Sequence, residues 1–277
     1  MNDIRMVYMG TVYSEWNQHA LSVRKGMIKT GEYCKGPVHW GGSLSCVEIL
    51  VCIMERLVEE KKDGIGASEL IISKGHAALV YYAVLAEYGL IPEDYYKEYQ
   101  GNSSIYTEEL TQNDTLGISC STGSLGQGLP FALGRAIRAK LKGDNKSRIY
   151  CLVGDGEMDE GAVWEAVLLA AQLKADNLIL LVDLNGLQSD GETENILGWR
   201  NLDAVLLAIG WEVHSIDGHD FMAIENAIQS NAVRPKAIMC KTVKGKGISF
   251  MENDPSWHDR YLRADELERA KKEVGLQ

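Results

Sequence analysis

Residues 148–156 read Arg-Ile-Tyr-Cys-Leu-Val-Gly-Asp-Gly, a short apolar run that ends in a carboxylate between two glycines. A run of this length with β-branched and aromatic residues is typical of a buried strand. Gly154 and Gly156 have no side chains and let the backbone approach a ligand closely, and Asp155 stands where the strand stops. The stretch therefore predicts a strand whose carboxyl end carries a binding site.

A second polar strand end follows one unit later. The predicted strand 178–183 leads into Asn185, which stands 30 residues after Asp155. This separation fits one helical crossover, so we expect the two strands to be neighbours. A carboxylate and an amide oxygen suit Mg²⁺, which takes its remaining ligands from diphosphate and water, and the N-terminus of the intervening helix favours a phosphate. The alternative is two unrelated turns.

Strands and helices alternate on both sides of this stretch. Predicted strands cover 69–73, 148–153, 178–183, 211–216 and 236–241, and predicted helices cover 15–30, 44–59, 75–88, 125–141, 160–174, 201–209, 221–229 and 265–272. Residues 33–42 and 99–121 are predicted to be loops. The alternation predicts an α/β fold, with a doubly wound, mostly parallel sheet and helices on both faces. Such sheets bind ligands at the carboxyl ends of their strands.

The bulk composition fits one domain over residues 1–277, in which roughly 245–277 form a polar C-terminal tail and helix. The sequence has no apolar run of about 20 residues and no secretory pattern at its start, so a cytoplasmic protein is expected. A net charge of −11 disfavours binding to nucleic acid or to anionic membranes. The six cysteines form no Cys-x-x-Cys pair, which predicts reduced thiols.

Three motifs make the sequence resemble the transketolase family. Residues 154–166 resemble its version of the thiamine diphosphate motif: Gly-Asp-Gly, then Glu-Gly, then Glu-Ala. Residues 122–128 match Thr-Gly-x-Leu-Gly-Gln-Gly, and residues 73–77 match Ser-x-Gly-His-Ala. The resemblance runs from about Trp16 to Gln277. It implies the thiamine diphosphate-binding fold, and within it the diphosphate-binding (PP) domain.

The resemblance also implies which residues hold the cofactor. Asp155, Asn185 and the backbone carbonyl of Leu187 would bind Mg²⁺, for which Ca²⁺ or Mn²⁺ can substitute. Contacts to thiamine diphosphate are expected from His76, Gly123, Ser124, Leu125, Gly154, Asp155, Gly156, Glu157, Glu160 and Asn185. Glu160 would bridge to a partner subunit; its alternative role is a first-turn acid that stabilises the helix dipole.

Three histidines are expected to be catalytic by the same resemblance: His76, His39 and His258. His39 lies in Val-His-Trp-Gly-Gly, where the family usually has Gly-His-Pro-Gly. A further family histidine would fall near Leu110, yet the chain has no histidine between His76 and His214. These departures leave the choice of substrate open.

The activity that the resemblance implies is transfer of a two-carbon ketol unit from a ketose (phosphate) donor to an aldose (phosphate) acceptor. The pyrimidine-binding domain and its activating glutamate would come from a C-terminal transketolase subunit in an α2β2 assembly. Three alternatives remain: a specialised split enzyme with an unusual donor or acceptor, a 2-oxoacid dehydrogenase α-subunit, and a non-catalytic cofactor-binding subunit. The second shares the metal motif but not the other two motifs.

Overall fold

The computed structural model describes residues 2–63, 67–197 and 201–276, with side chains from residue 11 onward. Its centre is a five-stranded sheet in the order β1-β2-β3-β5-β4, in which every pair of neighbours is parallel. The strands are β1 (Glu69–Ile72), β2 (Ile149–Gly154), β3 (Leu178–Leu184), β4 (Glu212–Asp217) and β5 (Lys236–Lys241). All five match predicted strands to within one residue at each end.

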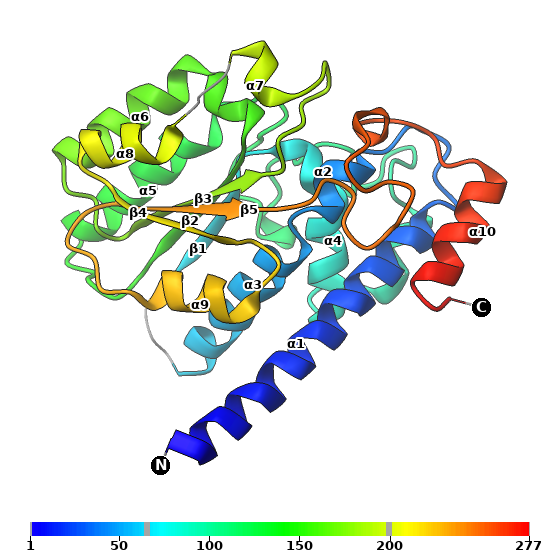
Figure 1. Ribbon diagram of the computed structural model, residues 1–277, viewed down its shortest axis with the longest axis horizontal. Helices are drawn as coiled ribbons and strands as arrows, with labels where there is room; N and C mark the ends of the chain where they lie inside the picture. The colour runs from blue at the N-terminus through cyan, green and yellow to red at the C-terminus, as the bar shows by residue number, and fades with distance from the viewer. Residues whose placement is uncertain (1, 64–66, 198–200, 277) are drawn as a thin grey trace.

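Helices cover both faces of the sheet (Figure 1). One layer contains α1 (Asn2–Thr30), α3 (Val47–Lys62), α4 (Ala78–Glu87) and α9 (Phe221–Gln229); the other contains α5 (Gly128–Leu141), α6 (Gly161–Gln172) and α8 (Leu202–Ile209). Side chains alternate along a strand, so Tyr150 and Leu152 enter the first core and Cys151 and Val153 enter the second. The doubly wound fold is confirmed.

Shorter elements connect these layers. They are the helices α2 (Trp40–Leu44), α7 (Thr193–Ile196) and α10 (Ala264–Glu273), with the 3₁₀ turns η1 (Gly75–Ala77), η2 (Glu93–Lys97), η3 (Asp114–Leu116), η4 (Gly156–Asp159) and η5 (Pro255–Trp257). The sequence did not predict α7. Residues 99–121 contain η3 but are otherwise irregular, close to the predicted loop.

Several helix boundaries differ from the predicted ones, and the predicted helix 75–88 is the 3₁₀ turn η1 followed by α4. Helix α1 begins at Asn2 instead of residue 15 and extends away from the body of the molecule (Figure 1). The start of α5 is delayed to Gly128, because Gly126 adopts a φ of +81° that a helix does not allow. The predicted helix 44–59 corresponds to α3, shifted by three residues, and the short helix α2 begins within the predicted loop 33–42.

The C-terminal tail packs on its own chain. Val38 and Arg260 form an isolated antiparallel bridge, Trp257 is buried, and Lys271 pairs with Glu32 at 2.7 Å. Helix α10 thereby lies against the end of α1 (Figure 1). Whether the tail also faces a partner subunit stays a prediction.

The cysteines and the helix lengths bear on two further expectations. All six cysteines are free thiols. Among the helices of the described residues, none is long and apolar enough to cross a bilayer.

Candidate active site

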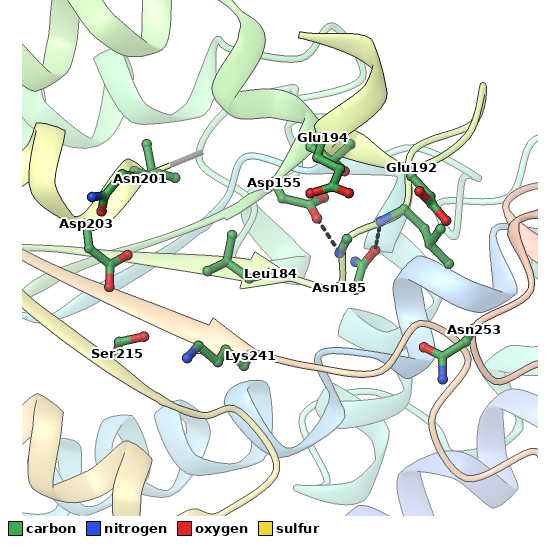
Figure 2. A pocket seen from close by; sticks show the side chains of 14 residues that line it. Asp155, Leu184, Asn185, Glu192, Glu194, Asn201, Asp203, Ser215, Lys241 and Asn253 are labelled. Carbon is green, nitrogen blue, oxygen red and sulfur yellow. Dashed lines mark hydrogen bonds between the residues drawn. The ribbon is translucent and has the colours of Figure 1, made fainter. Parts of the chain in front are cut away.

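The two polar strand ends meet at one edge of the sheet. Strands β2 and β3 are neighbours, and Gly154 lies opposite Asp183. The carboxylate of Asp155 accepts hydrogen bonds from the backbone N–H of Gly186 at 2.6 Å and of Gly156 at 2.8 Å. Figure 2 shows Asp155 beside Asn185 at this edge. The spacing of 30 residues thus places both side chains where the sequence predicted.

The electrostatics of this edge favour a bound cation. Burial and the nearby Asp183 raise the pKa of Asp155 to about 6, and the backbone N–H groups of Gly186 and Gly156, with Lys74, offset this only in part. The Oδ1 of Asn185 accepts one hydrogen bond, from the N–H of Leu187 at 3.2 Å, and keeps a free lone pair. Hard oxygen donors of this kind fit Mg²⁺.

The carbonyl of Leu187 faces a competing donor. Its oxygen accepts a hydrogen bond from the Nζ of Lys244 at 2.8 Å. A metal ion that used this oxygen would share it with the lysine or displace it. The donor set therefore fits a divalent cation, with Asp155 and Asn185 as its free ligands.

A buried ion pair lies directly behind the strand ends. Lys74 and Asp183 are 1% and 0% exposed, and the Nζ of Lys74 donates to the Oδ2 of Asp183 and, at 2.9 Å, to the carbonyl of Gly42. Ser45, Thr242 and Asn185 also donate to Asp183. The pairing raises the pKa of Lys74 and lowers that of Asp183, so both stay charged. The pair ties β3 to the turn that carries His76.

A cavity of about 350 Å³ opens beside Asp155, of a size typical for a small-molecule site. Its walls combine the strand ends, the predicted glycine loop and two lysines: Gly42, Lys74, His76, Leu125, Gly154, Asp155, Gly156, Glu157, Asp159, Glu160, Asn185, Leu187, Gln188, Ser189, Ile196, Lys244 and His258. Burial, together with repulsion from Lys74, lowers the pKa of Lys244 to about 8. A bound anion would relieve this repulsion, so the cavity fits a diphosphate next to a metal ion.

The glycine loop is fixed by Glu157. This buried carboxylate accepts hydrogen bonds from the hydroxyl of Ser73, from the N–H of Gly126 at 2.8 Å and from the N–H of Gly154 at 3.2 Å. It therefore locks together the three segments that the sequence motifs mark. Its influence on a cofactor would act mainly through the loop that it positions.

The other predicted contacts are distributed unevenly. Leu125 and Glu160 line the cavity, whereas Gly123 and Ser124 are exposed and lie outside its walls. Glu160 is the N-cap residue of α6, but its side chain makes no capping hydrogen bond. Both alternatives for Glu160, the contact with a partner and the helix-dipole role, remain predictions.

The three predicted histidines form one cluster. The ring centroid of His39 lies 5.3 Å from that of His76 and 5.4 Å from that of His258. The ring centroids of His76 and His258 are 5.6 Å apart. Gly42 lies beside them with little spare room, since a Cβ at this position would stand 3.3 Å from the Nε2 of His76. Segments that are far apart in the sequence thus bring these imidazoles to one end of the cavity.

All three histidines are held in their neutral form. Burial lowers the pKa of each, and the nearby lysines add to the effect, bringing the pKa of His258 to about 3. The Nδ1 of His258 lies 3.0 Å from the Nζ of Lys244. A neutral imidazole can accept a proton or a hydrogen bond from a substrate hydroxyl.

A larger cavity of about 720 Å³ shares the wall formed by Asp155, Asn185 and Leu187 (Figure 2). Its far side carries Glu192, Glu194, Asn201, Asp203, Ser215 and Lys241, from the region around α7 and from the ends of β4 and β5. The loop that divides the two cavities closes on itself, because the N–H of Gln188 donates to the carbonyl of Gly191 at 2.8 Å. The strand ends are therefore accessible from two sides.

Comparison with known proteins identifies the family. Residues 34–277 match the family model described as "Transketolase, thiamine diphosphate binding domain". This chain belongs to the transketolase family. This match begins at residue 34, after the end of α1.

Several transketolase relatives align over most of the chain. A subunit of an apulose-4-phosphate transketolase from Actinobacillus succinogenes is 41% identical, covering 95% of this chain and 96% of the relative. A 6-deoxy-6-sulfo-D-fructose transketolase subunit from Clostridium sp. is 36% identical over 82% and 84%. The crystal structure of transketolase from Campylobacter jejuni superimposes with a TM-score of 0.81 at 28% identity. It covers 95% of this chain, which spans only 42% of that longer chain.

Sequence reasoning missed three charged residues of this transketolase site. Lys74 is the variable position of the Ser-x-Gly-His-Ala motif, and Lys244 lies in a glycine-rich stretch after β5. Asp183 was predicted only as the last residue of a strand. The one available signal was a charged residue at the end of an apolar strand, since a buried charge there needs a partner.

Proposed function

We propose that this chain is the diphosphate-binding subunit of a two-subunit transketolase that transfers a two-carbon ketol unit from a ketose donor to an aldose acceptor. The observation that carries the proposal is the arrangement of the cavity. Asp155 and Asn185 line it together with two lysines, and a cluster of three neutral histidines lies at one end of it. The relatives whose names include a subunit designation cover nearly the same length as this chain.

The residues would act on the cofactor in three ways. Asp155 and Asn185, with the carbonyl of Leu187, would hold Mg²⁺, and Lys74 and Lys244 would balance the diphosphate charge. When bound, thiamine diphosphate supplies a nucleophilic carbon that carries the transferred unit. Glu157 would keep the glycine loop in place around it.

The histidines would act on the substrate. His76 and His258 line the cavity, and His39 lies against both. Because burial and nearby lysines hold them neutral, they can accept a proton from a donor hydroxyl as the carbon–carbon bond breaks and return a proton to the new hydroxyl as the bond forms.

The missing parts would come from another chain. We propose a C-terminal transketolase subunit that carries the pyrimidine-binding domain and the activating glutamate, in a cytoplasmic α2β2 assembly. The exposed Glu160 and the tail 245–277 are the proposed contacts with it. Residues 1–277 would then act as a single PP domain.

A specialised substrate is a second candidate within the same reaction class. Leu110, where the family histidine was expected, is 3% exposed, and its backbone bridges Gly75 and Thr122. Its side chain is therefore part of the core and cannot hydrogen-bond a sugar. The names of two relatives refer to apulose 4-phosphate and to 6-deoxy-6-sulfo-D-fructose, so both sugars belong in a substrate test.

The test is a ketol-transfer assay with thiamine diphosphate and Mg²⁺, on this chain alone and mixed with a candidate C-terminal transketolase subunit from the same organism. Xylulose 5-phosphate, apulose 4-phosphate and 6-deoxy-6-sulfo-D-fructose serve as donors, with ribose 5-phosphate and glyceraldehyde 3-phosphate as acceptors. Transfer only in the mixture is expected. Cofactor binding without turnover of any pair would instead support a non-catalytic role for this chain.

A further inference from the structure

Three polar side chains from distant segments form a continuous hydrogen-bonded group behind the cavity. Arg24 of α1 and Glu48 of α3 are 8% and 7% exposed, and the guanidinium donates two hydrogen bonds to the carboxylate, at 2.7 and 3.0 Å. The Nδ1 of His219, after β4, lies 2.9 Å from the same carboxylate. Although burial alone would raise it, the bonds from His219 and Arg24 bring the pKa of Glu48 to about 2, so this carboxylate stays ionised. The three residues are called the Arg–Glu–His triad below.

The histidine of the triad holds the segment that carries Lys244. The backbone N–H of Val243 donates to the Nε2 of His219 at 2.9 Å. Because Nε2 accepts this bond, the ring proton lies on Nδ1, from which it is donated to Glu48. The carboxylate thus fixes the tautomer that the backbone of Val243 requires.

Arg24 holds the same segment on the other side of Lys244. Its Nε donates to the carbonyl of Lys246 at 3.0 Å, while its two terminal nitrogens donate to Glu48. Gly247 makes this approach possible, since a Cβ there would stand 2.7 Å from the Nε of Arg24. The triad therefore binds the backbone one residue before Lys244 and two residues after it.

The segment between these two bonds reaches the cavity through one side chain. Of residues 242–247, all of which the structure describes, only Lys244 lines the cavity proposed for the diphosphate. Lys244 is 1% exposed, and its Nζ donates to the carbonyl of Leu187 at 2.8 Å and lies 3.0 Å from the Nδ1 of His258. A lysine side chain is long and flexible, so the place of its ammonium depends on where its backbone is held. The triad residues do not line the cavity and act on it through this segment.

We infer that the Arg–Glu–His triad is a set of positioning residues that hold Lys244 in place for the bound diphosphate, a role that rests on the proposed function and deepens it. With the backbone fixed on both sides, the ammonium is in place before the cofactor binds, which lowers the entropy that binding costs. Loss of the bond to Val243 should therefore weaken cofactor binding, although every group that lines the cavity remains.

Two substitutions of His219 separate its two hydrogen bonds. The amide oxygen of His219→Gln can replace Nε2 and accept from Val243. The NH₂ group of His219→Asn can replace Nδ1 and donate to Glu48, but the shorter side chain does not reach Val243. Calorimetry measures the Kd of thiamine diphosphate, with Mg²⁺, in the complex with the proposed C-terminal subunit. The Kd should rise about fivefold in His219→Asn, the scale of one backbone hydrogen bond, and less than about twofold in His219→Gln.

A double-mutant cycle tests whether the effect depends on Lys244. In a Lys244→Met background, His219→Asn should weaken cofactor binding no further, because the group that the triad positions is already absent. A general structural role would give the same loss in both backgrounds. The matched control is His214→Asn on β4, which removes another histidine–glutamate pair, with Glu212 at 2.7 Å, and should leave the Kd unchanged.

The outcomes distinguish this role from the proposed function. If the wild-type complex binds the cofactor but His219→Asn binds it equally well, the triad does not position Lys244 and the proposed function stands. The same holds if His219→Asn and His219→Gln lose affinity equally, or if the loss persists in the Lys244→Met background. If the wild-type complex does not bind the cofactor, the proposed function fails and the positioning role fails with it.

A second variant covers the case in which His219→Asn does not fold, which thermal unfolding would reveal. Arg24→Lys keeps a positive charge beside Glu48, but one ammonium cannot replace the three bonds of the guanidinium to Glu48 and Lys246. It should also raise the Kd of thiamine diphosphate, and only while Lys244 is present. An unchanged Kd in Arg24→Lys would contradict the positioning role.

Discussion

The metal end and the histidine end of the proposed site are constructed differently. At the metal end, side chains at or just beyond strand ends are fixed by buried bonds, such as those from Gly186 to Asp155 and from Lys74 to Asp183. At the histidine end, His39, His76 and His258 come from loops and turns that are far apart in the sequence, and their ring centroids lie 5.3 to 5.6 Å apart. The first arrangement follows from the sheet, whereas the second depends on how the loops are held against it.

The largest expected effect is on stability, from a substitution that breaks the buried ion pair at the metal end. Lys74→Met leaves Asp183 buried without its cation and should lower the free energy of unfolding by about 3–5 kcal/mol. Chemical denaturation measures the change, with the exposed Lys97→Met as control. Equal stability of the two variants would show that the pair does not hold this end together.

The next effect concerns the proposed metal ligand. Asp155→Asn should reduce ketol transfer in the mixed complex by at least about a hundredfold, since a first ligand matters more than the groups that support one. Without metal the variant should lose about 1 kcal/mol of stability, because one of the two oxygens that accept from Gly156 and Gly186 becomes an NH₂ group. Activity and thermal unfolding are compared with those of Glu165→Gln, an exposed position on α6. Full activity of Asp155→Asn would exclude it as a ligand.

At the histidine end, His76→Ala should lower kcat for ketol transfer by about a hundredfold, the lower range for a lost acid–base group. Binding of thiamine diphosphate, followed by calorimetry, should weaken much less than with Asp155→Asn. The reverse order of effects would mean that His76 mainly holds the cofactor.

A pH titration sharpens the contrast further. The pKa of Asp155 is raised to about 6, so protons compete with Mg²⁺ below that value, and the affinity should fall about tenfold per pH unit there. In the metal-free chain, the stability contributed by Asp155 changes with pH in the opposite direction. The raised pKa adds stability at low pH that is lost as the pH rises through about 6. Mg²⁺ affinity that stays constant from pH 7 to pH 5 would contradict this account.

The smallest effect lies outside both ends. Arg135 and Glu69 form an ion pair on a partly exposed surface, with side chains 32% and 24% exposed. Arg135→Ala should change the free energy of unfolding by less than about 1 kcal/mol and leave ketol transfer unchanged. If Arg135→Ala lowered the free energy of unfolding as much as Lys74→Met does, burial would not explain which ion pairs stabilise this fold.

The same contrast explains what the sequence could reveal. The strands and the meeting of Asp155 with Asn185 were predictable, because short apolar runs and one crossover determine which strand ends are neighbours. Clustering of His39, His76 and His258 was predicted only through family resemblance, since no local pattern joins three distant loops. Lys74 and Lys244 were missed, because a charge in a loop or turn looks solvated until the fold shows what surrounds it. The predicted helix 15–30 was shorter than α1, because the first half of α1 lacks an apolar period.

The most direct test of the central claim is ketol transfer by three samples, each with thiamine diphosphate and Mg²⁺: this chain, the proposed C-terminal subunit, and their mixture. The account predicts that only the mixture is active and that Asp155→Asn abolishes that activity while the two chains still associate. Full activity of the mixture with Asp155→Asn, or transfer by the C-terminal partner without this chain, would contradict it.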